Sequence, residues 1–188
     1  MDAEQRAAAA DAGVIVDHVP ERARRVLVVG DSTGGLAAAL EERGPVEVVG
    51  IELEDVPAGL GRFDCLVAAD VLEHLVDPWS ALEGYVRLLE PGCRAVIALP
   101  NANHWTAYAA LARGSWPRRP EGIHDAGHLR WFTLRDALEL CEGAGLRVEH
   151  VERRPWLLWR GTRLDRHAGP LARLAPFTFQ HVLAARRA

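Results

Sequence analysis

The chain has 188 residues, of which 49% are hydrophobic and 26% charged, and this suits a single domain with a substantial core. Its formal net charge of −4 argues against broad electrostatic capture of nucleic acid, and no apolar run is long enough for a transmembrane helix. Residues 1–11 lack the features of a signal peptide and the three cysteines form no CxxC pair, so we expect a cytoplasmic protein with reduced thiols.

Strands and helices are predicted to alternate along most of the chain. Residues 1–20 are expected to form an N-terminal helix that ends before Gly13 and a lead-in, followed by one domain over 21–188. The predicted elements are strands at 25–29, 46–51, 63–68, 95–99, 146–151 and 178–184 and helices at 36–42, 78–89, 104–112 and 134–142. Uninterrupted apolar strands alternating with helices indicate an α/β fold with an open, mainly parallel sheet, in which ligands bind at the carboxyl ends of the strands.

A glycine-rich turn follows the first predicted strand and leads directly into a helix. The turn contains Gly30, Ser32 and Gly34, and the start of the following helix leaves backbone N–H groups free to face a ligand. Glu52 ends the next strand, where a carboxylate can accept hydrogen bonds from both hydroxyls of a ribose. The pattern favours a nucleoside site over its alternative, a tight turn beside a surface acid.

Several motifs in the same order resemble those of the class I S-adenosylmethionine-dependent methyltransferases. Gly30 and Gly34 match the outer glycines of the G-x-G-x-G signature, and Ser32 stands at its middle glycine. Segments 63–75, 88–101 and 127–133 resemble the fourth strand, the fifth strand and a stretch before the next helix. The resemblance implies a Rossmann-like fold with helices on both faces, and S-adenosylmethionine held by Gly30, Ser32, Gly34 and Glu52.

The predicted sheet departs from the family pattern beside Glu52. Only residues 53–62 separate Glu52 from the next strand, where the family has a helix and another strand. Ten extended residues reach at most about 33–36 Å. The link has to cross about 10 Å of sheet and return along about 17–20 Å of strand. It can do so only as a loop with almost no helix or strand of its own. One βα unit is therefore expected to be missing, which leaves the strand before Glu52 at the edge of the sheet. Asp55 is a hypothetical substitute for the adenine-contacting acid of the missing unit.

A second group comprises Asp70, Glu73 and His74, with His128 further along the chain. It resembles small-RNA 2′-O-methyltransferases and ubiquinone-pathway O-methyltransferases, in which matching acids and histidines hold a divalent cation. The resemblance implies a metal site of Asp70, Glu73, His74 and His128, with Asp70, His74 and His128 acting on the acceptor. Two alternatives remain open: His74 or His128 is a general base without metal, or Glu73 and His74 cap the next helix and His128 packs its loop.

The long segment 113–130 is predicted to be a loop, and the tryptophans and histidines in and beside it suit either a substrate lid or partly exposed irregular structure. The cluster at 156–160 favours core or dimer contact over a membrane surface. The favoured function is methyl transfer from S-adenosylmethionine to a hydroxyl (or an amine) of a small molecule or glycan. The alternative is a catalytically inactive relative that acts as a binding or scaffolding subunit, in a homodimer or with a partner chain.

Overall fold

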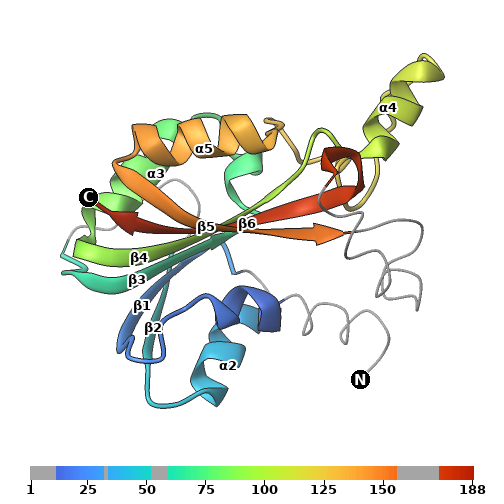
Figure 1. The fold of residues 1–188 in the computed structure, drawn as a ribbon. Helices are drawn as coiled ribbons and strands as arrows, with labels where there is room; N and C mark the ends of the chain where they lie inside the picture. The colour runs from blue at the N-terminus through green and yellow to red at the C-terminus, as the bar shows by residue number, and fades with distance from the viewer. Residues whose placement is uncertain (1–11, 32–33, 52–58, 156–173) are drawn as a thin grey trace.

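The computed structural model describes residues 12–31, 34–51, 59–155 and 174–188. Six strands form one sheet in the order β2-β1-β3-β4-β6-β5, shown in Figure 1. Their bounds are β1 Arg25–Val29, β2 Glu47–Ile51, β3 Phe63–Ala69, β4 Leu89–Pro100, β5 Leu146–Pro155 and β6 Thr178–Arg187. β1, β2, β3 and β4 pair in parallel, whereas β6 is antiparallel to both of its neighbours. The predicted α/β sheet is therefore confirmed.

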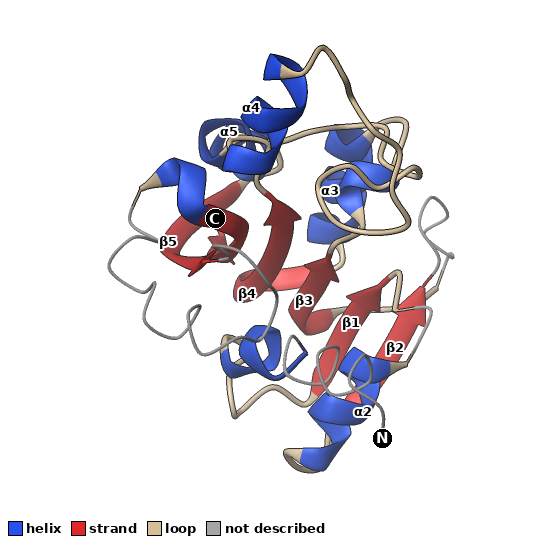
Figure 2. Cartoon of the chain, turned by 90° about the vertical axis from the view of Figure 1, so that its right-hand side faces the viewer, coloured by secondary structure: helices blue, strands red, loops and turns tan. Residues whose placement is uncertain are grey.

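Helices cover both faces of the sheet, as predicted. They are α2 Gly35–Glu42, α3 Pro78–Arg87, α4 Trp105–Ala112 and α5 Leu134–Gly143, with the short 3₁₀ turns η1 Leu72–His74 and η3 Ala175–Phe177. α3 and α5 lie over one face, while α2 and a helical stretch at residues 12–17 lie over the other (Figure 1). α4 stands away from the sheet at one end (Figures 1 and 2). None of the helices in the described chain has the length and hydrophobicity needed to cross a bilayer.

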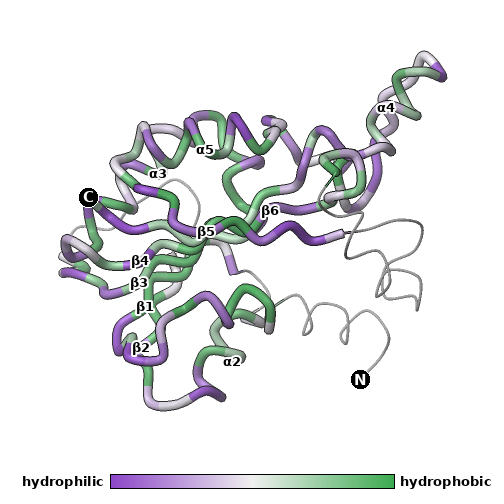
Figure 3. Tube along the Cα trace, in the orientation of Figure 1, coloured by the Kyte–Doolittle hydropathy of each residue, from purple (hydrophilic) through white to green (hydrophobic). Residues whose placement is uncertain are grey.

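The alternation of side chains along the central strands explains their uninterrupted apolar sequences. In β3, Leu66 and Ala68 belong to the core beneath α3 and α5, whereas Cys65 and Val67 belong to the core beneath α2. Because both faces are covered, neither set of side chains can be polar without cost. Figure 3 shows β1, β3 and β4 as a hydrophobic band through the middle of the molecule.

The prediction that the N-terminal helix ends before Gly13 is wrong. Residues 12–17 are helical, and Gly13 lies within them. Ile15 and Val16 pack in the same core as Val26 and Val28 of β1. Burying two such side chains contributes more than the roughly 1 kcal/mol that glycine costs inside a helix, so packing decides the outcome. The part of the predicted helix before residue 12 lies outside the described residues.

β4 is longer than the sequence suggests and starts at Leu89 rather than near residue 95. It passes through Pro91 and Gly92, which sequence patterns place in a turn. The pairing with β3 shifts register between Phe63 and Cys65, and Gly92 has a φ of 75°. This bulge accommodates Pro91 and Gly92 within the strand, because the extra backbone there makes no ladder hydrogen bond.

β2 is an edge strand in the described part of the chain. It pairs with β1 in parallel, and Ile51 lies opposite Val29. The structure therefore agrees with the expected loss of a strand beyond Glu52, while residues 52–58 themselves, including Glu52 and Asp55, lie outside the described residues.

Candidate functional site

The glycine turn lies at the carboxyl end of β1 and leads into α2. Gly30 and Gly34 both have left-handed backbone angles, with φ of 71° and 69°. The Asp31 carboxylate accepts a hydrogen bond of 2.9 Å from the backbone of Ala37 and so holds the start of α2. Apart from the residues adjacent to Gly34, no atom of the described chain lies within 4 Å of the position that a Cβ would take there, so the described structure leaves this side of the turn open. The turn leaves space beside a helix N-terminus, as a nucleoside site requires.

The glycine turn and Glu52, which together form the predicted cofactor site, follow paired positions of two neighbouring strands. Val29 and Ile51 are paired, and they immediately precede Gly30 and Glu52. Ser32 and Glu52 lie outside the described residues, so their contacts with a cofactor stay predictions.

Asp70 occupies a strained position at the carboxyl end of β3. Its φ of 51° is rare for a residue with a side chain, and such strain often accompanies function. The exposed Asp70 accepts hydrogen bonds from Gln180 Nε2 at 2.7 and 2.6 Å. Gln180 Oε1 in turn accepts a bond of 2.6 Å from Arg154, which determines the orientation of the amide. The described contacts therefore direct Asp70 toward β6.

Glu73, His74 and His128 lie together beside this strand end. One ligand atom from each lies within 4.8 Å of the others, and the rings of His74 and His128 are 4.8 Å apart at 70°. The structure thus brings together three of the four residues in the predicted metal site, and Asp70 is not among these three. Their roles in catalysis and metal binding stay predictions.

The backbone explains how residue 128 reaches residue 73. The carbonyl oxygen of Glu73 accepts bonds from Leu129 and Arg130, at 2.8 and 3.0 Å. These bonds fasten the long loop onto η1 immediately after His128. The following helix has its own cap, because the Asp77 side chain accepts a bond of 3.1 Å from Ser80. The alternative in which Glu73 and His74 cap that helix is therefore wrong.

The Glu73 carboxylate is buried without a hydrogen-bond partner in the described structure. The residue is 1% exposed, and neither carboxylate oxygen has a hydrogen-bond partner there. Burial, and then the neighbouring Asp70, raise the pKa of Glu73 well above its ordinary value of 4.5. Burial, followed by His74, lowers the pKa of His128, whose Nε2 lies 3.8 Å from Glu73 Oε1. A neutral imidazole beside an unsatisfied carboxylate is a donor set that fits a divalent cation.

The close approach of the loop to His74 requires a glycine at position 127. A Cβ built there would lie 3.0 Å from His74 Nδ1 and 3.1 Å from the Asp125 carboxylate. Gly127→Ala should displace His74 by a few tenths of an ångström and weaken Mn²⁺ binding about tenfold, as small changes around metal ligands do.

Isothermal titration with Mn²⁺ measures this effect. Gly143→Ala is the matched control, because a Cβ at Gly143 would meet nothing within 4 Å. Unchanged Mn²⁺ binding in Gly127→Ala would show that the approach of residue 127 does not position His74.

The long loop contains a cluster of aromatic side chains. Trp116 contacts His124 and Trp131, with ring centroids 4.7 and 5.8 Å apart. His104 precedes α4 as its N-cap residue, and its buried ring lies 5.7 Å from Phe179. The substrate-lid interpretation stays a hypothesis, and the predicted cluster at 156–160 lies outside the described residues.

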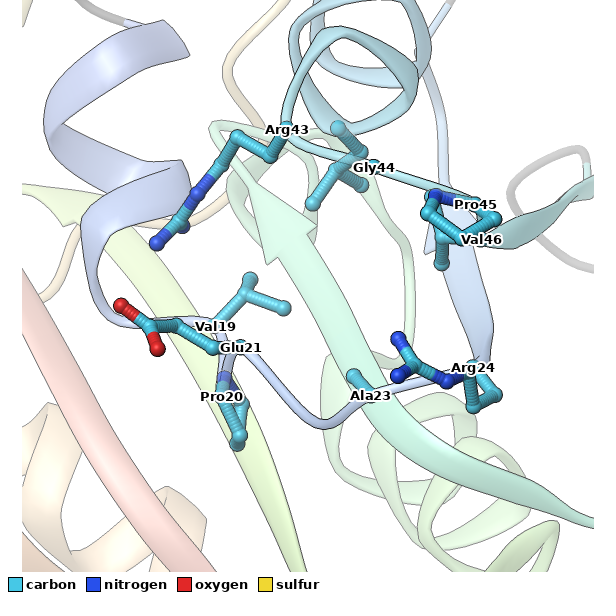
Figure 4. Close-up of a pocket in the computed structure, with 10 residues that line it drawn as sticks. Val19, Pro20, Glu21, Ala23, Arg24, Arg43, Gly44, Pro45 and Val46 are labelled. Carbon is cyan, nitrogen blue, oxygen red and sulfur yellow. The ribbon is translucent and has the colours of Figure 1, made fainter.

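A hollow of about 380 Å³ lies at the amino ends of the parallel strands, opposite the end that carries the glycine turn. Figure 4 shows its lining, which comes mainly from the segments that precede β1 and β2 and includes Arg24 and Arg43. The glycine turn follows β1 at its other end. This hollow is therefore separate from the predicted cofactor site.

A family model described as a methyltransferase domain matches residues 4–151. The chain belongs to this methyltransferase family. Its similarity to solved structures supports the same fold. A SAM-dependent methyltransferase from Archaeoglobus fulgidus has a TM-score of 0.66 at 14% identity, with 97% of this chain and 94% of the other covered. The small RNA methyltransferase HEN1 has a TM-score of 0.68 at 14% identity, with 95% of this chain and 25% of the other covered.

Among curated methyltransferases, a ubiquinone biosynthesis O-methyltransferase from Aeromonas salmonicida (strain A449) is 27% identical over 158 residues. The match covers 68% of this chain. This methyltransferase chain spans 65% of the length of that relative.

Proposed function

We propose that the chain transfers a methyl group from S-adenosylmethionine to a hydroxyl (or an amine) of a small molecule or glycan. The observation that carries this proposal is the meeting of Glu73, His74 and His128 at the carboxyl edge of the sheet, the edge on which the glycine turn also lies. Ligands of open α/β sheets bind at this edge. The similarity to an O-methyltransferase supports a hydroxyl acceptor.

The cofactor site in this proposal consists of Gly30, Ser32, Gly34 and Glu52. The open side of Gly34 leaves room for a ligand beside the start of α2, and the pairing of Val29 with Ile51 brings the two strand ends together. Bound S-adenosylmethionine supplies a methyl group already activated by its sulfonium. The protein then has to align the acceptor and remove its proton.

The acceptor site in this proposal consists of Asp70, His74 and His128, and Glu73, His74 and His128 hold a divalent cation. The buried, unpartnered oxygens of Glu73 fit such an ion, because coordination would satisfy them. A bound cation lowers the pKa of an acceptor hydroxyl. Asp70 follows β3 at the same edge of the sheet and is held by Gln180, and in this proposal its carboxylate orients the acceptor.

A second candidate function is a catalytically inactive binding or scaffolding subunit. The position of β2 at the edge of the described sheet favours it, since the family unit expected beyond β2 is shortened to the link 53–62. An edge strand also offers its backbone to a second copy or a partner chain.

Calorimetric titration with S-adenosylmethionine and with its demethylated product distinguishes the two candidates. Methyl transfer requires that both ligands bind to the folded chain, and we expect weak but saturable heat. The absence of heat and of any thermal shift at millimolar ligand would overturn the enzymatic proposal and leave the scaffold.

A further inference from the structure

A second hollow lies beside the one shown in Figure 4, at the amino ends of the parallel strands. Its volume is about 520 Å³, and the two hollows share Pro20, Glu21 and Ala23, which precede β1. The rest of its lining is Arg22, Asp64, Gly92, Cys93, Arg94 and Arg186. Figure 1 shows that the start of β4, the end of β6 and the segment before β1 lie at the same edge of the sheet. A hollow of this size is large enough for a small ligand.

Three arginines stand side by side across neighbouring strands at this edge, and we call them the arginine row. Arg94 of β4 is paired with Arg186 of β6, and Arg186 is paired with Arg147 of β5. Side chains of directly paired residues share one face of the sheet, with their Cβ atoms about 4.5–5.5 Å apart. Like charges in such positions destabilise a sheet, so the arginine row requires negative charge beside it.

The described structure supplies one carboxylate to the arginine row. The register of β5 against β6 shifts at Glu149, which forms a bulge with no paired residue on β6. Its carboxylate accepts hydrogen bonds from Arg186 at 3.0 and 3.3 Å, from Arg147 at 3.2 Å and from Arg94 at 3.5 Å. Three arginines and one glutamate leave a formal net charge of +2 on these four residues.

Two of the arginines that line the hollow are incompletely bonded in the described chain. Arg94 Nε is buried without a hydrogen-bond partner, and the terminal nitrogens of Arg94 reach Glu149 and the carbonyl oxygen of His18 only at 3.5 and 3.4 Å. The exposed Arg22 side chain makes no hydrogen bond or ion pair with any described residue. A buried donor without a partner is costly, so a ligand that accepts its hydrogen bond would be stabilised here.

The two acids that line the hollow leave its charge positive. The Asp64 carboxylate accepts hydrogen bonds of 2.8 and 3.1 Å from the backbone of Arg24 and Arg25, and so holds the segment before β1 in place. The other acid, Glu21, is exposed. Three arginines face these two acids, so the formal charge of the lining favours an anion.

We propose that this hollow binds a phosphate dianion, either free phosphate or the phosphate group of a small monoester. The planar fork of a guanidinium matches phosphate oxygens, and such charge-assisted bonds are the strong ones. Arg22 donates to the phosphate from the segment before β1 and Arg94 donates from β4, while Arg186 stays with Glu149. The bound phosphate adds the negative charge that the arginine row lacks. This site and the proposed cofactor site lie at opposite ends of the strands, so both can be occupied at once.

Calorimetric titration of the metal-free full chain with inorganic phosphate and with glycerol 3-phosphate tests the proposal. Sodium chloride at equal ionic strength is the control for screening. We expect saturable heat and a rise in melting temperature with both phosphates, and neither with chloride. Tighter binding of glycerol 3-phosphate would identify a monoester as the ligand, whereas equal binding would identify free phosphate. The titration needs neither S-adenosylmethionine nor an acceptor, so its result is independent of methyl transfer.

Two arginine variants locate the bound phosphate. Arg22→Gln and Arg94→Gln should each weaken phosphate binding about tenfold or more, because each removes a charge-assisted hydrogen bond. Arg135→Gln makes the same change of charge and should bind phosphate as the wild type does, since Arg135 has an 85% exposed side chain at the start of α5. Melting temperatures without phosphate check that each variant is folded.

Glu149→Gln is expected to have the opposite effect. The substitution removes the carboxylate that competes with phosphate for the arginine row, so phosphate should bind about tenfold more tightly. Phosphate should also raise the melting temperature of this variant by more than that of the wild type. General damage to the structure would not strengthen phosphate binding, so this variant separates a binding site from a merely structural cluster.

Three results would overturn the proposal. They are the absence of saturable binding of either phosphate to the wild type, unchanged binding in both Arg22→Gln and Arg94→Gln, and binding to Glu149→Gln that is no tighter than binding to the wild type. Saturable wild-type binding that neither arginine variant weakens would place the phosphate elsewhere, such as at the glycine turn.

Discussion

Glu73→Gln is expected to abolish measurable binding of Mn²⁺ or Mg²⁺ by the isolated chain. The substitution keeps the size of the side chain but removes the only carboxylate in the group formed with His74 and His128. Changes to residues that merely support metal ligands cost roughly 10–100-fold in affinity, so loss of a ligand should cost about 100-fold or more. Isothermal titration measures the affinity. Glu83→Gln, an exposed position on α3, is the control with the same change of charge.

The same variant should be at least as stable as the wild type in the presence of a chelator. Because the pKa of Glu73 is raised in the folded state, the folded chain retains a proton that the unfolded chain loses above pH 4.5. The wild-type free energy of unfolding therefore falls as the pH rises above that value, and the Glu73→Gln variant would lack this loss. Unfolding in denaturant across this pH range measures the difference. If the variant were less stable than the wild type and still bound Mn²⁺, Glu73 would not be a ligand of the metal.

Glu52→Gln is expected to weaken binding of S-adenosylmethionine about tenfold or more. A carboxylate that accepts two ribose hydroxyl bonds makes charge-assisted contacts worth about 1.5–3 kcal/mol each, and about 1.4 kcal/mol is one decade in affinity. Calorimetry with the cofactor and its demethylated product measures the change. Glu47→Gln, at the other end of β2, is the control, since Glu47 pairs with Arg25 at 3.0 Å.

Ser32→Gly restores the residue that the family signature has at the middle of the turn. It should leave cofactor binding equal or improve it, because a Cβ and hydroxyl no longer stand beside the ligand. Equal binding by wild type and Glu52→Gln would place the cofactor elsewhere in the chain.

Much of the fold can be predicted from local sequence. The apolar strands of 25–29 and 63–69 can be buried on both faces only in a covered parallel sheet, and the structure has them there. The short link after Glu52 likewise predicts an edge strand from chain length alone. The proximity of Glu73 and His74 to His128 follows only from a motif resemblance, since nothing local connects residues that far apart.

The remaining features depend on contacts that no local pattern reports. Gln180 and Arg154 belong to strands formed late in the chain, and their link to Asp70 exists only because β6 lies beside β4. From the sequence alone, the role of Gln180 could have been inferred only from the presence of a polar residue in a predicted buried strand. The helix at 12–17 and the passage of β4 through Pro91 are both decided by tertiary packing, which outweighs the preferences of glycine and proline.

The place of β6 between β4 and β5 restricts the order in which the sheet can assemble. β5 follows β4 in the chain, yet the strand that pairs with β4 is β6, which is synthesised after β5. β5 is a poor occupant for the position beside β4, because only its first residue is buried in the structure and the exposed Arg147, Glu149 and Arg153 would be covered there. The polar sequence of β5 thus disfavours its pairing with β4, and the sheet cannot be completed until β6 is present to join the two strands.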